Sequence, residues 1–103
     1  MIEAFDVLNR WTGAVQFTAQ IDCEPNATVS VKLALSVLWA VKNGASLVDA
    51  NLDGARLDGA RLDGASLDGA SLDGASLVDA NLDGASLVGA RLDGARLDRK
   101  SVV

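Results

Sequence analysis

Residues 45–64 read Ala-Ser-Leu-Val-Asp, Ala-Asn-Leu-Asp-Gly, Ala-Arg-Leu-Asp-Gly and again Ala-Arg-Leu-Asp-Gly. The same unit of five residues, with Ala first and Leu third, continues without a slip to Arg99 and gives eleven consecutive pentads. Self-similarity at a fixed period is typical of repeat proteins, in which each unit buries its apolar side against its neighbours. The repeat therefore decides the fold of just over half of the chain.

A five-residue period fits neither an α-helix nor a straight strand. Five residues advance an α-helix by ~500°, so successive leucines would scatter around its axis, and eight pentads end in Gly, which costs roughly 1 kcal/mol inside a helix. In a strand, a step of five would place successive leucines on opposite faces. The chain must therefore turn once per pentad, with Ala and Leu facing one interior and Asp-Gly forming the corner.

This pattern resembles the pentapeptide-repeat family, whose motif is Ala, a polar residue, Leu or Phe, and two variable positions; the resemblance covers residues 45–99. It implies an all-β solenoid, a right-handed quadrilateral β-helix with four pentads per coil and about 2.75 coils. The inward positions then supply the core. The predicted core residues are Leu47, Leu52, Leu57, Leu62, Leu67, Leu72, Leu77, Leu82, Leu87, Leu92, Leu97, Ala50, Ala70 and Ala90.

The outward positions leave two interpretations open. The second position is Ser, Arg or Asn, and the fourth is Asp in eight pentads. These aspartates either form a solvated surface that protects strand edges, or an acidic recognition surface. Four-per-coil stacking also places Val48 and Val88 on one face, as tolerated surface residues or as a small contact patch. The candidate interaction surface comprises Asp53, Asp58, Asp63, Asp68, Asp73, Asp83, Asp93, Val48 and Val88.

The first 44 residues have a different pattern and are expected to cap the solenoid within one structural domain. Apolar and polar residues alternate over 15–21, which predicts a strand paired with 2–8 in a hairpin spanning 2–21. Apolar residues at helical spacing predict a helix over about 28–42, begun by Thr28 or Asn26 and stopped by Asn43-Gly44. Residues 9–13 and 31–44 also resemble the leader of some phage and bacterial pentapeptide-repeat proteins. We expect Trp11 and Trp39 in the cap core.

Composition excludes several classes of function. The chain has 103 residues, a net charge of -5, no His and one cysteine, Cys23, so it has no histidine base, no disulfide framework and no cysteine-rich zinc site. We expect no catalytic, metal-binding or cofactor-binding residues, and no direct nucleic-acid binding because basic residues are too few. The longest apolar stretch, 31–41, is too short to span a bilayer and no basic-then-apolar leader opens the sequence. We therefore expect a cytoplasmic protein that does not bind membranes.

The last coil has no evident cover, since only the tail 100–103 follows the repeats. A truncated sequence, an end that tolerates exposure, and two chains stacked through their C-terminal coils all remain open. The stacked homodimer is the leading hypothesis, because Val102 and Val103 are apolar.

Three functions are compatible with the sequence. The first is a non-enzymatic structural or protein-interaction solenoid whose protein partner is unknown. The second follows from the resemblance: some acidic family members mimic duplex DNA and act on DNA gyrase, although they have longer stacks and this chain places four arginines at second positions, among the aspartates. The third is an engineered or truncated version of the repeat fold, suggested by near-identical repeats.

Overall fold

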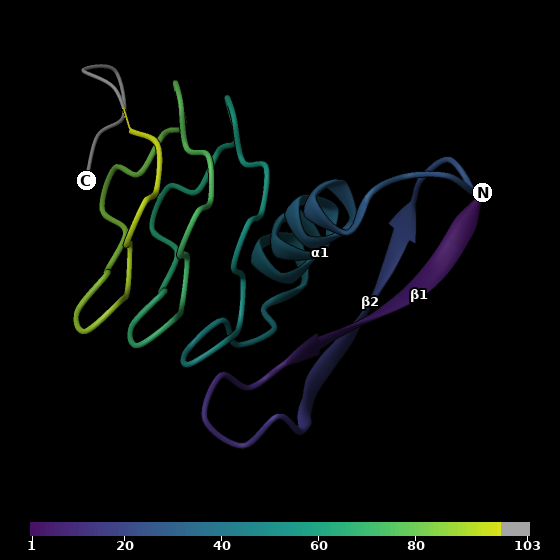
Figure 1. Ribbon diagram of the computed structural model, residues 1–103, viewed down its shortest axis with the longest axis horizontal. Coiled ribbons are helices and arrows are strands. Elements are labelled where there is room, and N and C mark those ends of the chain that lie inside the picture. The colour runs from purple at the N-terminus through teal and green to yellow at the C-terminus, as the bar shows by residue number, and fades with distance from the viewer. Residues whose placement is uncertain (98–103) are drawn as a thin grey trace.

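The computed structural model describes residues 1–97 and begins with a hairpin and a helix (Figure 1). Strand β1 spans Ile2–Leu8, β2 spans Val15–Asp22, and helix α1 spans Val29–Asn43. The rest of the described chain winds in stacked turns that contain isolated bridges rather than long strands. Figure 1 shows α1 between the hairpin and the first of these turns.

The hairpin follows from its alternating residues. β1 pairs antiparallel with β2, and the pairing shifts near Leu8, where the strand turns toward the repeats. Val7, Ala19 and Ile21 are buried on one face of the sheet, while the residues between them face solvent. Phe17 on that buried face stacks against Trp39 of α1, with ring centroids 6.0 Å apart. The hairpin therefore lies on one side of the helix.

The expectation that Trp11 belongs to the cap core is wrong. Its side chain is 69% exposed, because the 9–14 connection lies against the outside of the first turn of the repeats and not inside the cap. The indole Nε1–H donates to Asp49 Oδ1 at 3.3 Å, so the polar part of the ring is satisfied while its apolar area faces solvent. Only Trp39 is partly buried.

Helix α1 begins and ends at the capping residues that the sequence predicts. The Thr28 side chain accepts a hydrogen bond from the Val31 N–H, and Gly44 adopts the left-handed conformation with φ of 74°. Leu33, Ala34 and Val37 belong to the same apolar cluster as the repeat leucines. The helix thus covers the open end of the first turn of the repeats. Within residues 1–97, no helix has the length and apolarity needed to cross a membrane.

The repeats stack in register every twenty residues. Parallel bridges join Asn51 to Ser71 and Ser71 to Arg91, and the other columns repeat the same offset. From Leu52 to Leu77, each repeat Leu N–H donates to the second-position carbonyl of the next turn, as Leu52 does to Ser71 at 2.8 Å. The Ser71 N–H in turn donates to the Ala50 carbonyl at 2.9 Å. Four pentads therefore make one turn of the stack, which buries Leu47, Leu52, Leu57, Leu62, Leu67, Leu72, Leu77 and Leu82, with Ala50 and Ala70.

The corners use left-handed backbone at the fifth position of each described pentad. Glycine occupies most of these positions, with φ near 70°. Asp49 and Asp79 take the same conformation with φ of 62° and 61°, which a short polar side chain tolerates. A Cβ at Gly69 would also lie 2.1 Å from Asp49 Oδ1, so a side chain there would displace the Asp49 carboxylate.

The core expectation fails at the last described turn. Leu97 is 44% exposed rather than buried, and Leu87, Leu92 and Ala90 are only partly buried. The reason is geometric: a leucine is enclosed by the turns on both sides of it, and no residue within 1–97 lies twenty positions beyond these four.

The cap also satisfies the backbone of the first turn. The Asn51 N–H donates to the Leu8 carbonyl at 2.7 Å, and the Arg56 N–H donates to the Ser30 carbonyl at 3.1 Å. The Arg10 N–H donates to the Asp49 carbonyl at 2.8 Å. The hairpin and helix thus supply partners that a preceding turn would otherwise provide.

Candidate interaction surface

The twenty-residue register sorts the outward side chains into four faces. Each face is a column of pentads, and its chemistry is set by their second and fourth positions. We name the first column the Ser-Val face, the second the Asp-Arg face, the third the Arg face and the fourth the corner face. The Ser-Val face comprises residues 46–48, 66–68 and 86–88, and the Asp-Arg face comprises 51–53, 71–73 and 91–93. The Arg face comprises 56–58, 76–78 and 96–97. The corner face comprises 61–63 and 81–83.

Aspartates at the fourth position hydrogen-bond to the next turn. Asp53 Oδ1 accepts from the Asp73 N–H at 3.1 Å, and Asp73 Oδ1 accepts from the Asp93 N–H at 3.0 Å. Asp68 Oδ1 accepts from the Val88 N–H at 3.0 Å. The fourth-position N–H has no backbone acceptor in these pentads, so the carboxylate of the preceding turn satisfies it. These aspartates therefore link neighbouring turns.

Serine hydroxyls of the next turn complete the same contacts. Ser71 donates its hydroxyl to Asp53 Oδ1, Ser76 to Asp58 Oδ1 and Ser86 to Asp68 Oδ1. Hydrogen bonds to a charged acceptor are stronger than those between neutral groups. A Ser at the second position and an Asp at the fourth position one turn earlier thus form a structural pair.

In three pentads, the side chain at the second position accepts from the fourth-position N–H of the same pentad. Asn51 Oδ1 accepts from the Asp53 N–H at 3.2 Å, and Asn81 Oδ1 accepts from the Asp83 N–H at 3.0 Å. Ser46 Oγ accepts from the Val48 N–H at 3.2 Å. This is the local turn bond that Asn and Ser favour, so these three side chains satisfy a backbone group of their own pentad.

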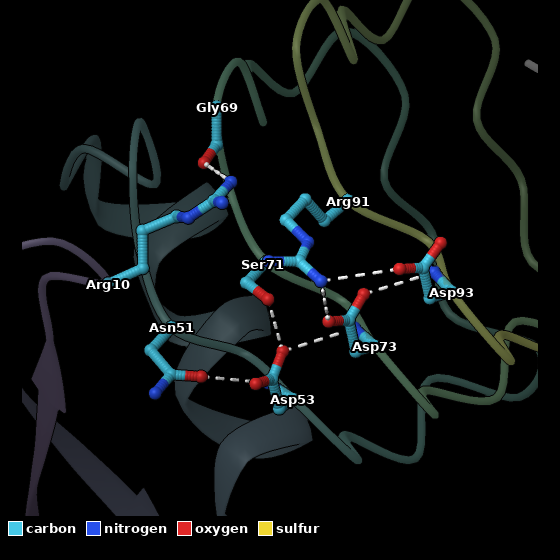
Figure 2. A network of polar contacts seen from close by, with 8 residues as sticks. All are labelled: Arg10, Asn51, Asp53, Gly69, Ser71, Asp73, Arg91 and Asp93. Carbon is cyan, nitrogen blue, oxygen red and sulfur yellow. Dashed lines mark hydrogen bonds and ion pairs between the residues drawn. The ribbon is translucent and has the colours of Figure 1, made fainter.

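The Asp-Arg face carries a connected polar network (Figure 2). The Arg91 guanidinium lies 3.2 Å from Asp73 Oδ2 and 3.2 Å from Asp93 Oδ2, so one cation bridges two carboxylates of successive turns. In Figure 2, dashed lines join Arg91 to both aspartates, and Asp53 and Ser71 extend the network toward the first turn. This face is a chain of paired charges and not a bare acidic strip.

The Ser-Val face is different because it presents apolar side chains and hydroxyls. Val48 is 39% exposed and Val88 is 75% exposed, and Asp68 lies between them in the column. No arginine or lysine occurs in its pentads, 45–49, 65–69 and 85–89. Beside this face, a shallow hollow is lined by residues that include Val41, Val48 and Ser66.

Two residues of the hairpin connection border the Ser-Val face. The Arg10 guanidinium carbon lies 4.1 Å from the centre of the Trp11 ring, and Arg10 Nη1 donates to the Gly69 carbonyl at 2.8 Å. Trp11 itself is tied to Asp49, the residue after Val48. The exposed indole is thus held in a fixed position at the edge of this face.

A charged contact joins β1 to α1 on the cap. Lys32 Nζ lies 2.8 Å from Glu3 Oε2. The hydrogen bond from Lys32 lowers the pKa of Glu3 below its ordinary value of 4.5, and the same bond raises the pKa of Lys32 above 10.5. The Cys23 thiol lies 3.8 Å from Glu3 Oε1 and is partly buried.

Within residues 1–97, no three His, Cys, Asp or Glu side chains cluster closely enough to hold a metal ion.

The predicted surface residues therefore divide by what they contact. Asp53, Asp58, Asp68 and Asp73 bond to the next turn. Asp63 pairs loosely with Arg61 at 3.5 Å, and Asp93 pairs with Arg91. Val48 and Val88 share a face. Sequence reasoning missed Arg10 and the exposed Trp11 as part of this surface, because no repeat pattern marks where the hairpin connection lies.

A comparison with protein-family models matches eight copies of the pentapeptide repeat over residues 45–82 and 60–99. No curated protein matches the chain. Among solved structures, the chain is similar to a pentapeptide repeat protein, Rfr23, from the cyanobacterium Cyanothece 51142. The two are 35% identical over 55% of this chain, with a TM-score of 0.41, and the match spans 42% of the length of that protein. The chain belongs to the pentapeptide-repeat family and its repeats form a β-helix solenoid, which confirms the resemblance found in residues 45–99.

Proposed function

We propose that this member of the pentapeptide-repeat family is a non-enzymatic scaffold that binds a protein partner through the Ser-Val face and the adjoining Trp11. The observation that carries the proposal is the contrast between faces. Four of the predicted surface aspartates bond to neighbouring turns, whereas Val88 and Trp11 are mostly exposed.

The chemistry of the patch suits a protein interface. Tryptophan and arginine are enriched among residues that dominate binding energy, and Arg10 stacks on Trp11 at the edge of the Ser-Val face. Val48 and Val88 add apolar area, and Asp68 between them is already hydrogen-bonded to the Ser86 hydroxyl and the Val88 N–H. Because the stack is held by backbone ladders, little conformational entropy is lost when a partner binds.

The finer architecture of the solenoid is a proposal that rests on the resemblance to the family. We propose a right-handed, four-sided β-helix of about 2.75 turns, since eleven pentads at four per turn give that length. Its reducing, cytoplasmic setting is part of the same proposal, because the single cysteine cannot form a disulfide within the chain.

The last described turn supports a second partner, another copy of the chain. The N–H groups of Leu82, Leu87 and Leu92 have no acceptor within residues 1–97, whereas those of the repeat leucines from Leu52 to Leu77 donate to the next turn. Stacking of two such turns would pair these groups and cover the partly exposed leucines. Sedimentation equilibrium at several concentrations tests the dimer, and a constant monomer mass would rule it out.

A DNA-mimicking rod that acts on gyrase is the alternative function. The Asp53, Asp73 and Asp93 column favours it, because stacked carboxylates give a line of negative charge. The Arg91 contacts with two of these carboxylates weaken it. A gyrase supercoiling assay separates the two functions. The scaffold predicts no effect on the enzyme, and inhibition that disappears on charge reversal at the exposed Asp93 would favour the mimic.

Site-specific photo-crosslinking tests the Ser-Val face directly. A photoreactive amino acid placed at position 88 is expected to capture a protein in cells of the source organism. The matched control is position 83, which is also an exposed fourth position but lies on the corner face. Capture at position 88 alone supports the proposal, while capture at neither position, or equally at both, contradicts it.

A further inference from the structure

Seven pentads contain an Asp-Gly step, and this step has a chemistry of its own. The backbone nitrogen of Gly can attack the side-chain carboxyl carbon of the preceding Asp, so that a C–N bond forms, the nitrogen loses its proton and water leaves. Water then opens the resulting succinimide at either C–N bond and gives aspartate or isoaspartate. The attack requires a Gly N–H free of other bonds and a backbone able to rotate. The seven steps are Asp53-Gly54, Asp58-Gly59, Asp63-Gly64, Asp68-Gly69, Asp73-Gly74, Asp83-Gly84 and Asp93-Gly94.

Five of these steps are held by the next turn of the stack. The Gly54 N–H donates to the Asp73 carbonyl at 2.9 Å, and the Gly64 N–H donates to the Asp83 carbonyl at 2.8 Å. Gly59, Gly69 and Gly74 make the same ladder bond at 2.8 Å. Each of these nitrogens is therefore occupied, and its peptide unit is fixed between two turns.

The other two steps lie in the last described turn. Within residues 1–97, the N–H groups of Gly84 and Gly94 have no hydrogen-bond partner. Asp83 is exposed and its carboxylate makes no hydrogen bond or ion pair with another described residue, whereas Asp93 is paired with Arg91. The free nitrogen and the unpaired carboxylate coincide at Asp83-Gly84.

We propose that Asp83 is the principal site at which this chain converts spontaneously to isoaspartate, with Asp93 second and the five interior Asp-Gly steps protected by the stack. The Arg91 ion pair slows Asp93, because the carboxylate must leave the guanidinium before its carbon can approach the Gly94 nitrogen. The product lengthens the backbone by one methylene at a corner of the last turn.

The Asn43-Gly44 step is the site that sequence alone would select, because a side-chain amide forms a succinimide more readily than a carboxylate. In the structure the Gly44 N–H donates to the Ala40 carbonyl as the helix cap. The Asn43 amide donates to the Trp39 carbonyl at 2.8 Å. Both reacting groups are held, so we expect this step to be slow in the folded chain.

The test compares the seven steps within one molecule. The folded chain is incubated in dilute neutral solution, and a matched sample is incubated in urea. Isoaspartate is then located by electron-transfer dissociation of the intact chain and quantified with an isoaspartyl methyltransferase. We expect Asp83 to convert about tenfold or more faster than the interior sites in the folded sample, and all seven sites to convert at similar rates in urea.

Two variants provide a matched pair in one column. Asp83→Glu removes the reactive step, because glutamate closes the larger ring far more slowly, and we expect it to remove most of the isoaspartate formed by the folded chain. Asp63→Glu, one turn earlier on the corner face, should leave the yield unchanged. Equal conversion at interior and last-turn sites in the folded chain would overturn the proposal. Preference for Asp83 in urea would also overturn it, since local sequence and not the fold would then explain the site.

Discussion

The side-chain amide of Gln16 donates to the backbone carbonyl of Ser46 at 2.8 Å. The same nitrogen also donates to the Val48 carbonyl at 2.8 Å. In the stack, second-position and fourth-position carbonyls accept from the Leu and Gly N–H groups of the preceding turn. One glutamine of the hairpin thus replaces two backbone donors at the edge of the first turn.

Gln16→Leu is expected to lower the free energy of unfolding by about 1–3 kcal/mol, because two edge carbonyls lose their donor. The measurement is urea unfolding followed by the fluorescence of Trp39 and Trp11. Gln20→Leu is the matched control, since Gln20 is exposed on the same strand. Equal destabilisation by both variants would show that Gln16 acts through strand propensity alone.

The Ser-Asp pairs predict that serines at the same pentad position contribute differently to stability. Ser71→Ala removes the hydroxyl bonded to Asp53 and is expected to cost about 1 kcal/mol of stability. Ser66→Ala should change stability by less than about 0.5 kcal/mol, because Ser66 is exposed. Urea titration of both variants checks this order, and a larger loss at position 66 would contradict the structural role of Ser71.

The stability cost of replacing a leucine by alanine should depend on how deep that leucine lies in its column of the stack. Leu57→Ala is expected to cost about 2–5 kcal/mol, since Leu57 is 1% exposed. Leu97→Ala should cost about 1 kcal/mol or less, because its side chain is already 44% exposed. Thermal unfolding of the two variants measures the difference. Similar losses would mean that Leu97 is covered in solution, as the stacked dimer requires.

The Glu3–Lys32 contact makes the stability of the fold depend on pH in a defined direction. The lowered pKa of Glu3 stabilises the fold above pH 4.5, and this contribution is lost as the pH falls through the folded-state pKa. The raised pKa of Lys32 stabilises the fold below pH 10.5, and this contribution is lost as the pH rises through its folded-state pKa. The Tm difference between the wild type and Glu3→Gln should therefore be constant between these limits and shrink outside them. A difference that persists at low pH would contradict the assignment to Glu3 ionisation.

Most of the solenoid could be predicted from the repeat because the residue types of each pentad determine its local geometry. Ala and Leu two residues apart define the inside, and Asp-Gly defines the corner with its left-handed backbone. The chemistry of the outside could not be read so directly. Asp53 and Asp93 occupy the same pentad position, yet one bonds to the next turn and the other lies in the last described turn.

The contacts between the cap and the repeats also could not be predicted, and the reason is different. Gln16, Arg10 and Trp11 reach residues between 30 and 59 positions away, and no periodic signal links such positions. Trp11 shows the consequence, since an apolar residue type suggested the core although the path of the connection places the ring outside.

Amide hydrogen exchange at Val88 tests most directly whether the aspartates hold the stack together and leave the Ser-Val face for a partner. The Val88 N–H donates to the Asp68 carboxylate and has no backbone acceptor within residues 1–97. We predict that this amide is protected in the wild type and loses its protection in Asp68→Ala, while the Leu67 amide, bonded to the Ser86 carbonyl, stays protected in both. Exchange at Val88 as fast in the wild type as in the unfolded chain would show that the carboxylate does not hold the next turn, and the aspartates would then be free to form an acidic binding surface.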